Sequence, residues 1–417
     1  MRILIVATSA LIGALWGATV PVLALVLLAP AQYGPFSAVY LVFAYGMSLQ
    51  YSIVSEAWAR ARGKYRKTTN WSSYSSALSA LATAIGSVAL ALSLILVEMR
   101  ALAVWFGLAV GLGVYRSGAR YHRMAVGATR RVILADILGL LSFIVVLFSW
   151  PGVDRVAILV VAWATSGLVS LIALGLPSLR RGAGPFRWWK LHKKEITPLL
   201  TDSTLMDVGA IGAPFLLAGF MGPTNFGLYR GVANAAMPVR LLIDPLRPTI
   251  GRKPSEFFFK KSVLGGISGI TFAFAAGCYA ALEFLVPRLP VRLGTLSELV
   301  VFSSQAAVFT AASFVGTLFY VVCRNNSTRW TILKGRITQT LLVVLMPVIG
   351  FASFGLVGAV WGFSLSALLS AVVWMYLSMP PRAGSDARFV TRWNQRSKLF
   401  IGSQKNSSSA DATGLDN

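Results

Sequence analysis

The stretch Tyr33-Gly34-Pro35-Phe36-Ser37-Ala38-Val39-Tyr40 indicates an internal repeat, because it returns in altered form as Gly222-Pro223-Thr224-Asn225-Phe226-Gly227-Leu228-Tyr229. In both stretches a Gly-Pro turn leads to an aromatic residue and then to a tyrosine, and a long apolar segment opens there. The apolar spans on either side of the first stretch recur beside the second stretch at the same offset along the chain. Repeated halves are common among proteins that cross the membrane many times, so the sequence predicts a duplicated molecule.

Apolar segments recur along almost the whole chain, and a membrane-spanning helix needs about 20 predominantly apolar residues. Twelve such segments lie at residues 3–28, 37–57, 75–97, 101–115, 132–150, 156–176, 196–220, 226–246, 263–286, 299–322, 337–354 and 356–377. Of the 417 residues, 56% are hydrophobic and 12% charged, whereas soluble domains carry about 25% charged residues. We therefore predict an all-α membrane protein with about 12 spans, because such a composition excludes an ordinary soluble enzyme.

Positive charge is concentrated in alternate loops. The formal net charge of +24 reflects 38 Lys and Arg against 14 Asp and Glu, which in a soluble protein would suggest a nucleic-acid partner. Here most cationic residues lie in the second, fourth, sixth, eighth and tenth loops and in the C-terminal tail. This asymmetry follows the positive-inside rule. It predicts cytoplasmic N- and C-termini, a multi-pass protein of the inner (plasma) membrane, and no nucleic-acid partner.

The repeat and the spans define the expected domain organisation. We predict an N-terminal six-helix lobe at residues 1–177, a basic cytoplasmic linker at 178–195, a C-terminal six-helix lobe at 196–380 and a polar tail at 381–417. Very short outer turns join the last two spans of each half, at 151–155 and around Gly355. Because each half has an even number of spans, the halves are related by a pseudo-two-fold axis along the membrane normal. The first apolar run is too long for a signal peptide, so it is the first span.

Motifs that indicate catalysis or a cofactor are missing from the sequence. It contains no Gly-rich phosphate-binding loop, and its two histidines, His122 and His192, have no Cys or His at ligand spacing. Cys278 and Cys323 give no disulfide framework. We therefore expect no enzyme activity, no cofactor and no metal site.

Two acidic residues fall inside the seventh span. Counting 1.5 Å per residue from Ile196 places Asp207 near the membrane midplane and Asp202 nearer the cytoplasmic end. A charge at this depth must face protein or water. Either residue is a candidate for coupling transport to a proton or sodium gradient, or it is a structural carboxylate that hydrogen-bonds to hydroxyls such as that of Thr204.

Basic residues within the eighth span are candidates for binding a substrate. Arg230 and Asn234 are four positions apart, so they share one face of a helix and could bind a sugar or phosphate in a cavity. Arg240 and Asp244 have the same spacing, and a self-neutralising ion pair is the alternative to a cavity role for Arg240.

Three arginines continue the fourth span toward the cytoplasm. Arg116, Arg120 and Arg123 follow one another at spacings of four and three, which places them on one helical face. Guanidinium groups bind phosphate oxygens in pairs, so Arg116 and Arg120 are candidates for a pyrophosphate. The alternative is a basic strip that contacts anionic membrane lipids. Asp136 lies near the end of a span and receives no role.

The segments Gly219-Phe220-Met221-Gly222-Pro223 and Phe226-Gly227-Leu228-Tyr229-Arg230 resemble the start of the eighth span in Wzx-type polysaccharide flippases of the multidrug/oligosaccharidyl-lipid/polysaccharide (MOP) superfamily. The resemblance covers residues 3–377. It implies two six-helix lobes around a central cavity that opens alternately to either side. It also implies a polyprenyl-pyrophosphate-linked oligosaccharide as substrate, with a polysaccharide polymerase or glycosyltransferases as partners.

Two other functions remain open from the sequence. The first is a cation-coupled multidrug exporter of the same superfamily, which Asp202 and Asp207 favour and Arg230 disfavours. The second is a membrane scaffold for polysaccharide assembly that transports nothing and needs no charge facing a cavity.

Overall fold

The computed structural model describes residues 2–64, 71–150, 152, 154–177, 184–239, 242–243, 246, 250 and 253–380. Every regular element within these ranges is a helix. The predicted all-α fold is therefore confirmed.

The N-terminal half begins with a pair of long helices and continues with two antiparallel hairpins. Its elements are α1 (Arg2–Leu27), α2 (Pro30–Leu49), η1 (Gln50–Ser55), α3 (Glu56–Lys64), α4 (Trp71–Ile95), η2 (Val97–Leu102), α5 (Ala103–Ala125), α6 (Thr129–Ser149) and α7 (Arg155–Leu174). Helix α4 packs on α5, α6 packs on α7, and α1 lies against α6 and α7. The side chain of Asp154 caps α7 by accepting a hydrogen bond from the amide of Ala157, which satisfies one of the free donors at the helix start.

The C-terminal half repeats this plan with more interruptions. Its elements are α8 (Pro185–Asp207), η3 (Val208–Gly212), α9 (Ala213–Ala218), α10 (Pro223–Ala235), α12 (Ser255–Phe258), α13 (Lys261–Ala280), η4 (Ala281–Leu285), η5 (Val286–Arg288), α14 (Gly294–Glu298), η6 (Leu299–Phe302), α15 (Ser303–Asn326) and α16 (Arg329–Leu377). Helix α15 packs against both α13 and α16.

Helix α16 is two antiparallel helices joined by a tight turn. The backbone leaves the helical region at Phe354 and at Gly355, which has φ of 58°, a conformation that costs glycine little. The indole nitrogen of Trp374 donates to the Gln339 amide oxygen at 3.1 Å, so the two arms pack side by side. This is the short turn predicted around Gly355.

Eight stretches of the described residues are long and apolar enough to cross a membrane by length and composition. The count is lower than the predicted twelve for identifiable reasons. Helix α16 counts once although it has two antiparallel arms, and α1 contributes only the shorter stretch Leu15–Leu27. Helix α8 begins with a polar segment, and α10 is only 13 residues long. With these elements included, the helices follow the twelve predicted spans in order.

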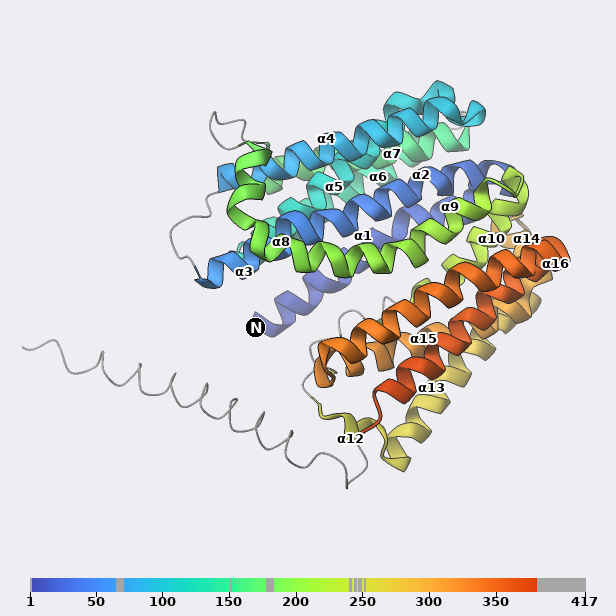
Figure 1. Cartoon of the computed structure of the whole chain (residues 1–417). Coiled ribbons are helices and arrows are strands. Elements are labelled where there is room, and N and C mark those ends of the chain that lie inside the picture. Colours follow the sequence, from blue (N-terminus) through green and yellow to red (C-terminus); the bar gives the residue numbers. More distant parts are fainter. Residues whose placement is uncertain are drawn as a thin grey trace, which may run out of the picture.

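Figure 1 shows the helices as two groups. The groups lie together where α9, α10 and α14 are labelled, and they diverge toward the end that carries the N-terminus, α3 and α12. The contacts agree, since α2 packs along α10, and α14 touches both α1 and α2. A diverging pair of lobes is the arrangement that a central cavity requires.

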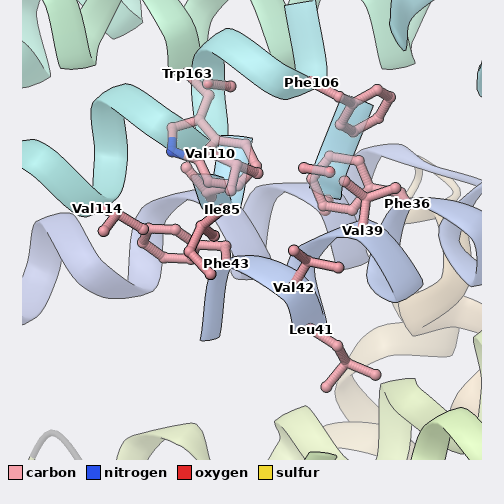
Figure 2. Packing of buried hydrophobic residues seen from close by; sticks show 14 of the residues in the cluster. Phe36, Val39, Leu41, Val42, Phe43, Ile85, Phe106, Val110, Val114 and Trp163 are labelled. Carbon is pink, nitrogen blue, oxygen red and sulfur yellow. The ribbon is translucent and has the colours of Figure 1, made fainter. Parts of the chain in front are cut away.

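The N-terminal group is held by a core of aromatic and branched side chains (Figure 2). Phe36 and Phe43 of α2 face Phe106 of α5 and Trp163 of α7. The ring centroids lie 5.9 Å apart for Phe36 and Phe106 and 5.1 Å apart for Phe43 and Trp163. Because lipid is as apolar as this interior, close packing rather than the hydrophobic effect holds such helices together.

The internal repeat has a different register from the predicted one. Pro35 lies inside α2, so the sequence Gly34-Pro35 is not a turn. Pro30 and Pro223 instead occupy the start of α2 and α10, in the same position. Gly34 and Gly227 then correspond, and they touch. A Cβ on Gly34 would lie 2.0 Å from the carbonyl oxygen of Pro223, so the two repeats meet backbone to backbone.

Candidate substrate and ion sites

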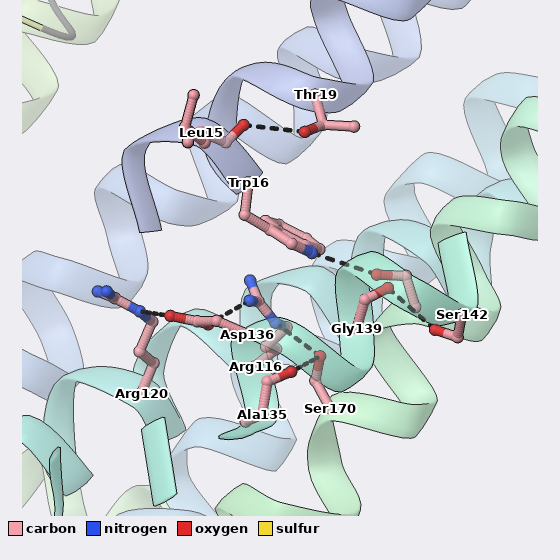
Figure 3. Close-up of polar contacts among 11 residues, drawn as sticks. Leu15, Trp16, Thr19, Arg116, Arg120, Ala135, Asp136, Gly139, Ser142 and Ser170 are labelled. Atoms are coloured by element: carbon pink, nitrogen blue, oxygen red, sulfur yellow. Dashed lines mark hydrogen bonds and ion pairs between the residues drawn. The ribbon is translucent and has the colours of Figure 1, made fainter. Parts of the chain in front are cut away.

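A buried cluster of charges joins three helices of the N-terminal group (Figure 3). Asp136 of α6 accepts hydrogen bonds from Arg116 at 2.5 Å and from Arg120 at 3.0 Å, both on α5. Asp136 and Arg116 are buried. Arg116 also donates to the hydroxyl of Ser170 on α7 at 3.0 Å. Since two guanidinium groups share one carboxylate, the cluster carries an excess of positive charge.

The cluster reaches α1 through Trp16 and Gly13. The guanidinium carbon of Arg116 lies 3.5 Å from the centroid of the Trp16 ring, which is a cation–π contact. The guanidinium of Arg120 lies against Gly13, where a Cβ would be 2.2 Å from its Nη2. The Arg120 side chain keeps 25% of its surface exposed, so it is the charged member of the cluster that a ligand can reach.

The three arginines do not form the outward-facing strip that their spacing suggested. Arg116 points into the bundle toward Asp136, and Arg123 donates to the carbonyl oxygen of Leu174 at 2.7 Å while lying over the ring of Trp71. Asp136, to which no role was given, is the shared partner. Asp136 lies 20 positions after Arg116 and 16 positions after Arg120 in the sequence. Spacing within a single helix does not reveal such a contact.

A second polar site lies where α2 packs on α10. Asn234 hydrogen-bonds through its amide nitrogen to the hydroxyl of Tyr33. Arg230 lies one turn earlier on α10, is buried, and acts electrostatically on Tyr33. The predicted pair of Arg230 and Asn234 therefore sits at the junction of the two halves.

A third site surrounds Asp207, the last residue of α8. Ser48 of α2 is the polar side chain that interacts with this buried carboxylate, in place of the expected Thr204. Its Oδ2 has no hydrogen-bond partner among the described residues. Arg336 of α16 is the nearby cation. Asp202 lies a turn and a half earlier on α8 and is half-buried.

Arg336 is a site residue that the sequence analysis missed. It immediately precedes the apolar segment 337–354, so it was assigned to a cytoplasmic loop. In the structure it is buried, its guanidinium lies 4.0 Å from the Tyr320 ring centroid, and it donates to Gln339 at 3.0 Å. Its neighbours Tyr320, Gln339 and Trp374 are polar or aromatic residues within predicted spans. These positions were the sequence signal that could have indicated a polar site near Arg336.

Irregular helix turns accompany these sites. Asp207 directly precedes η3, and Ser48 lies two residues before η1. Both η1 and η3 are π-helices, which occur mostly as single turns and often at functional sites.

The remaining predicted pair, Arg240 and Asp244, lies outside the described residues. Among the described residues, no three His, Cys, Asp or Glu side chains gather as metal ligands do.

No family model matches the sequence, and no curated protein is similar to it at a significant level. Solved structures are similar. A multidrug-resistance MATE family transporter of the MOP superfamily in its inward-facing conformation gives a TM-score of 0.57 at 13% identity, over 87% of this chain and 93% of that one. The lipid II flippase MurJ in an inward closed conformation gives a TM-score of 0.54 at 11% identity, over 90% and 87%.

The chain has the fold of MOP-superfamily transporters. An outward-facing MATE structure matches nearly as well, with a TM-score of 0.54 at 15% identity over 90% of this chain and 94% of that one. The MOP fold therefore extends over almost the whole protein, including both lobes. At these identities the likeness concerns the fold, and both the multidrug-resistance transporters and the lipid II flippase share it.

Proposed function

We propose that the protein is a flippase that moves a polyprenyl-pyrophosphate-linked oligosaccharide from the cytoplasmic to the outer leaflet of the inner membrane. Such a head group cannot cross about 30 Å of hydrocarbon unaided, because burying unpaired charges and hydroxyls in hydrocarbon is very costly. Two lobes that open alternately replace its hydration shell with protein groups, and the polyprenyl tail stays in lipid. No bond is made or broken.

The observation that carries this proposal is the excess positive charge of the Arg116, Asp136 and Arg120 cluster. A site for a cationic drug needs an accessible carboxylate, whereas Asp136 is fully buried and shared by two arginines. Arg120 is partly exposed, and guanidinium suits the oxygens of a pyrophosphate. Buried Arg230 at the junction of the two halves adds a further positive charge. The likeness to a lipid II flippase supports the same substrate class.

One observation favours cation-coupled multidrug export instead. Asp207 has a carboxylate oxygen with no described partner in a buried position, and the MATE structures belong to multidrug-resistance transporters. In a flippase the same carboxylate is a site for the coupling ion. The two functions therefore differ in what the N-terminal cluster binds.

The test is transport by the purified protein in proteoliposomes that contain a fluorescent polyprenyl-pyrophosphate-linked sugar. We expect the sugar to become accessible to an added glycosidase as it reaches the outer leaflet. Arg120→Gln removes the excess charge and keeps the buried Arg116 and Asp136 pair, so flipping should fall at least about tenfold, as for loss of a charge-assisted hydrogen bond. Arg131→Gln, at an exposed position, serves as the control.

The outcome separates the two candidates. Uptake of a cationic dye driven by a proton or sodium gradient, without movement of the lipid-linked sugar, would establish the exporter and refute the flippase. In cells, a deletion should cause the lipid-linked precursor to accumulate on the cytoplasmic face. A polymerase and glycosyltransferases are the expected partners.

A further inference from the structure

The first part of α8, Pro185–Glu195, is a helix with one face fixed to the protein. Trp188 is buried and donates from its indole nitrogen to the carbonyl oxygen of Ile53 at 2.9 Å. Ile53 belongs to the π-helix η1, in which the usual helical bonding is interrupted. The ring of His192 lies 4.1 Å from that of Trp188, between centroids, and is also buried. This face fixes the rotation of the segment about its axis.

The opposite face has no such cover. Phe186 is 90% exposed, Trp189 is 41% exposed and Leu191 is 57% exposed. Lys190, Lys193 and Lys194 alternate with them and are exposed as well. The acidic residue of this segment, Glu195, is buried on the inner face. The outward face therefore combines large apolar side chains with positive charge and contains no acid.

The segment lies directly next to a predicted membrane span. It ends at Glu195, directly before the seventh predicted span. Figure 1 shows the first turns of α8 running across the end of the N-terminal group before the helix turns to run alongside α2. Pro198 lies inside α8, and because it cannot donate its backbone hydrogen bond, it permits such a bend. In the predicted topology, the exposed face is thus held at the level of the cytoplasmic head groups.

We propose that the outward face of Pro185–Glu195 is a binding surface for anionic phospholipid head groups of the cytoplasmic leaflet. Phe186 and Trp189 insert below the phosphates, and Lys190, Lys193 and Lys194 neutralise them. Helices with aromatic and basic residues on one face bind membrane interfaces in this way. The lysines discriminate for anionic lipid, at about fivefold in affinity for each basic residue near the surface.

This inference is independent of the substrate, because no group of the proposed transport route takes part. It also places the lipid contact on the linker between the halves, whereas Arg116 and Arg120 of α5 pair with Asp136. Helix α8 continues to Asp207 and η3, and η3 packs on α16. Lipid bound at Pro185–Glu195 therefore acts on the helix that connects the two halves.

The test places an environment-sensitive dye at residue 186 through Phe186→Cys, with Cys278→Ser to remove the half-buried native thiol. The labelled full-length protein is reconstituted into nanodiscs of phosphatidylcholine with increasing phosphatidylglycerol. We expect a blue shift that saturates as phosphatidylglycerol rises. Replacing Lys190, Lys193 and Lys194 with Gln should abolish the blue shift over the range of phosphatidylglycerol that saturates the parent. The same change at the exposed Lys253, Lys260 and Lys261 should leave it unaltered.

Each other outcome overturns the proposal. An equal blue shift in pure phosphatidylcholine would show apolar insertion without selection for charge. An equal loss in both triple variants would show a general effect of net charge rather than a surface on α8. A dye that stays in water at every lipid composition would show that this face does not contact lipid, and would leave a protein partner as its occupant.

Discussion

Asp136 is the residue on which the N-terminal polar cluster depends, because it is the partner of two arginines. Asp136→Asn leaves Arg116 buried beside a neutral amide. Removing one partner of a buried ion pair costs about 3–5 kcal/mol, so we expect a large drop in the midpoint of thermal unfolding in detergent. Combining it with Arg116→Met should recover part of the loss. Glu256→Gln, at an exposed acid, is the control. A midpoint within one degree of the parent would contradict the role of this pair.

His192 gives the protein a pH-dependent stability. Burial lowers the pKa of His192 below its ordinary 6.5, against the opposing effect of Glu195. As pH falls below 6.5 the unfolded chain takes up a proton that the folded chain resists, so stability is lost on acidification and is complete above that value. His192→Phe keeps the ring contact with Trp188. It should flatten the dependence of the unfolding midpoint between pH 7.5 and pH 5.5, whereas an unchanged slope would assign the effect to other groups.

At the residue scale, the sequence located polar positions better than it located their partners. Arg230 and Asn234 share a helix as predicted, because a spacing of four is a property of the helix itself. Asp136 and Ser48 could not be assigned, since their partners come from other helices. Arg336 was expected in a loop but lies within α16. Hydropathy marks where an apolar run begins, whereas the helix begins earlier, at Arg329. The substrate and ion roles of these residues stay predictions.

At the scale of elements, the contact between α2 and α10 makes a strong prediction. A Cβ on Gly34 or Gly227 would lie 2.0 Å or 2.2 Å from a backbone carbonyl oxygen of the facing helix, and backbone cannot move aside as a side chain can. Gly34→Ala should therefore push the halves apart and sharply reduce transport in proteoliposomes. Gly265→Ala on α13 meets nothing within 4 Å and should transport normally. Equal activity of the two variants would show that this close contact is dispensable.

Element boundaries show which signals the sequence carries. The turn at Gly355 was predicted because an apolar run of 41 residues, from 337 to 377, must reverse to stay within the membrane. Helix α8 begins at Pro185, well before the predicted span at 196, because amphipathic turns have low mean hydropathy. The π-helices η1, η3 and η4 were not predicted, since a one-residue insertion leaves no mark on hydropathy. At η1 the carbonyl oxygen of Ile53 accepts a hydrogen bond from Trp188 of α8, a contact that hydropathy does not reveal.

At the scale of the whole molecule, duplication was readable from the sequence and the placement of the halves was not. The repeat fixed an even number of spans in each half, but the register was wrong, because Gly34-Pro35 resembles a turn and lies inside a helix. The correspondence of Pro30 with Pro223 becomes clear only once the first residues of α2 and α10 are known. Likewise, α8 contacts α3, α4 and η1 as well as α16, so the first helix after the linker bridges both halves.

Alternating access requires the converging ends of the halves to separate, and this can be tested at one contact. Thr295 of α14 donates from its amide and its hydroxyl to the carbonyl oxygen of Leu28 at 2.7 and 2.8 Å. These backbones are close enough for a disulfide. Leu28→Cys with Thr295→Cys, in a Cys278→Ala background, should therefore cross-link on oxidation and stop transport, and reduction should restore it.

The matched control for this cross-link lies within a single lobe. A Cβ on Gly316 of α15 would lie 3.5 Å from that of Ala371 on α16, which suits a disulfide. Gly316→Cys with Ala371→Cys should cross-link equally well while transport continues, because α15 and α16 move together. If the cross-link between Leu28 and Thr295 left transport intact, the ends that converge in this structure would not open during the cycle. Rocking of the halves would then be the wrong description of how the protein works.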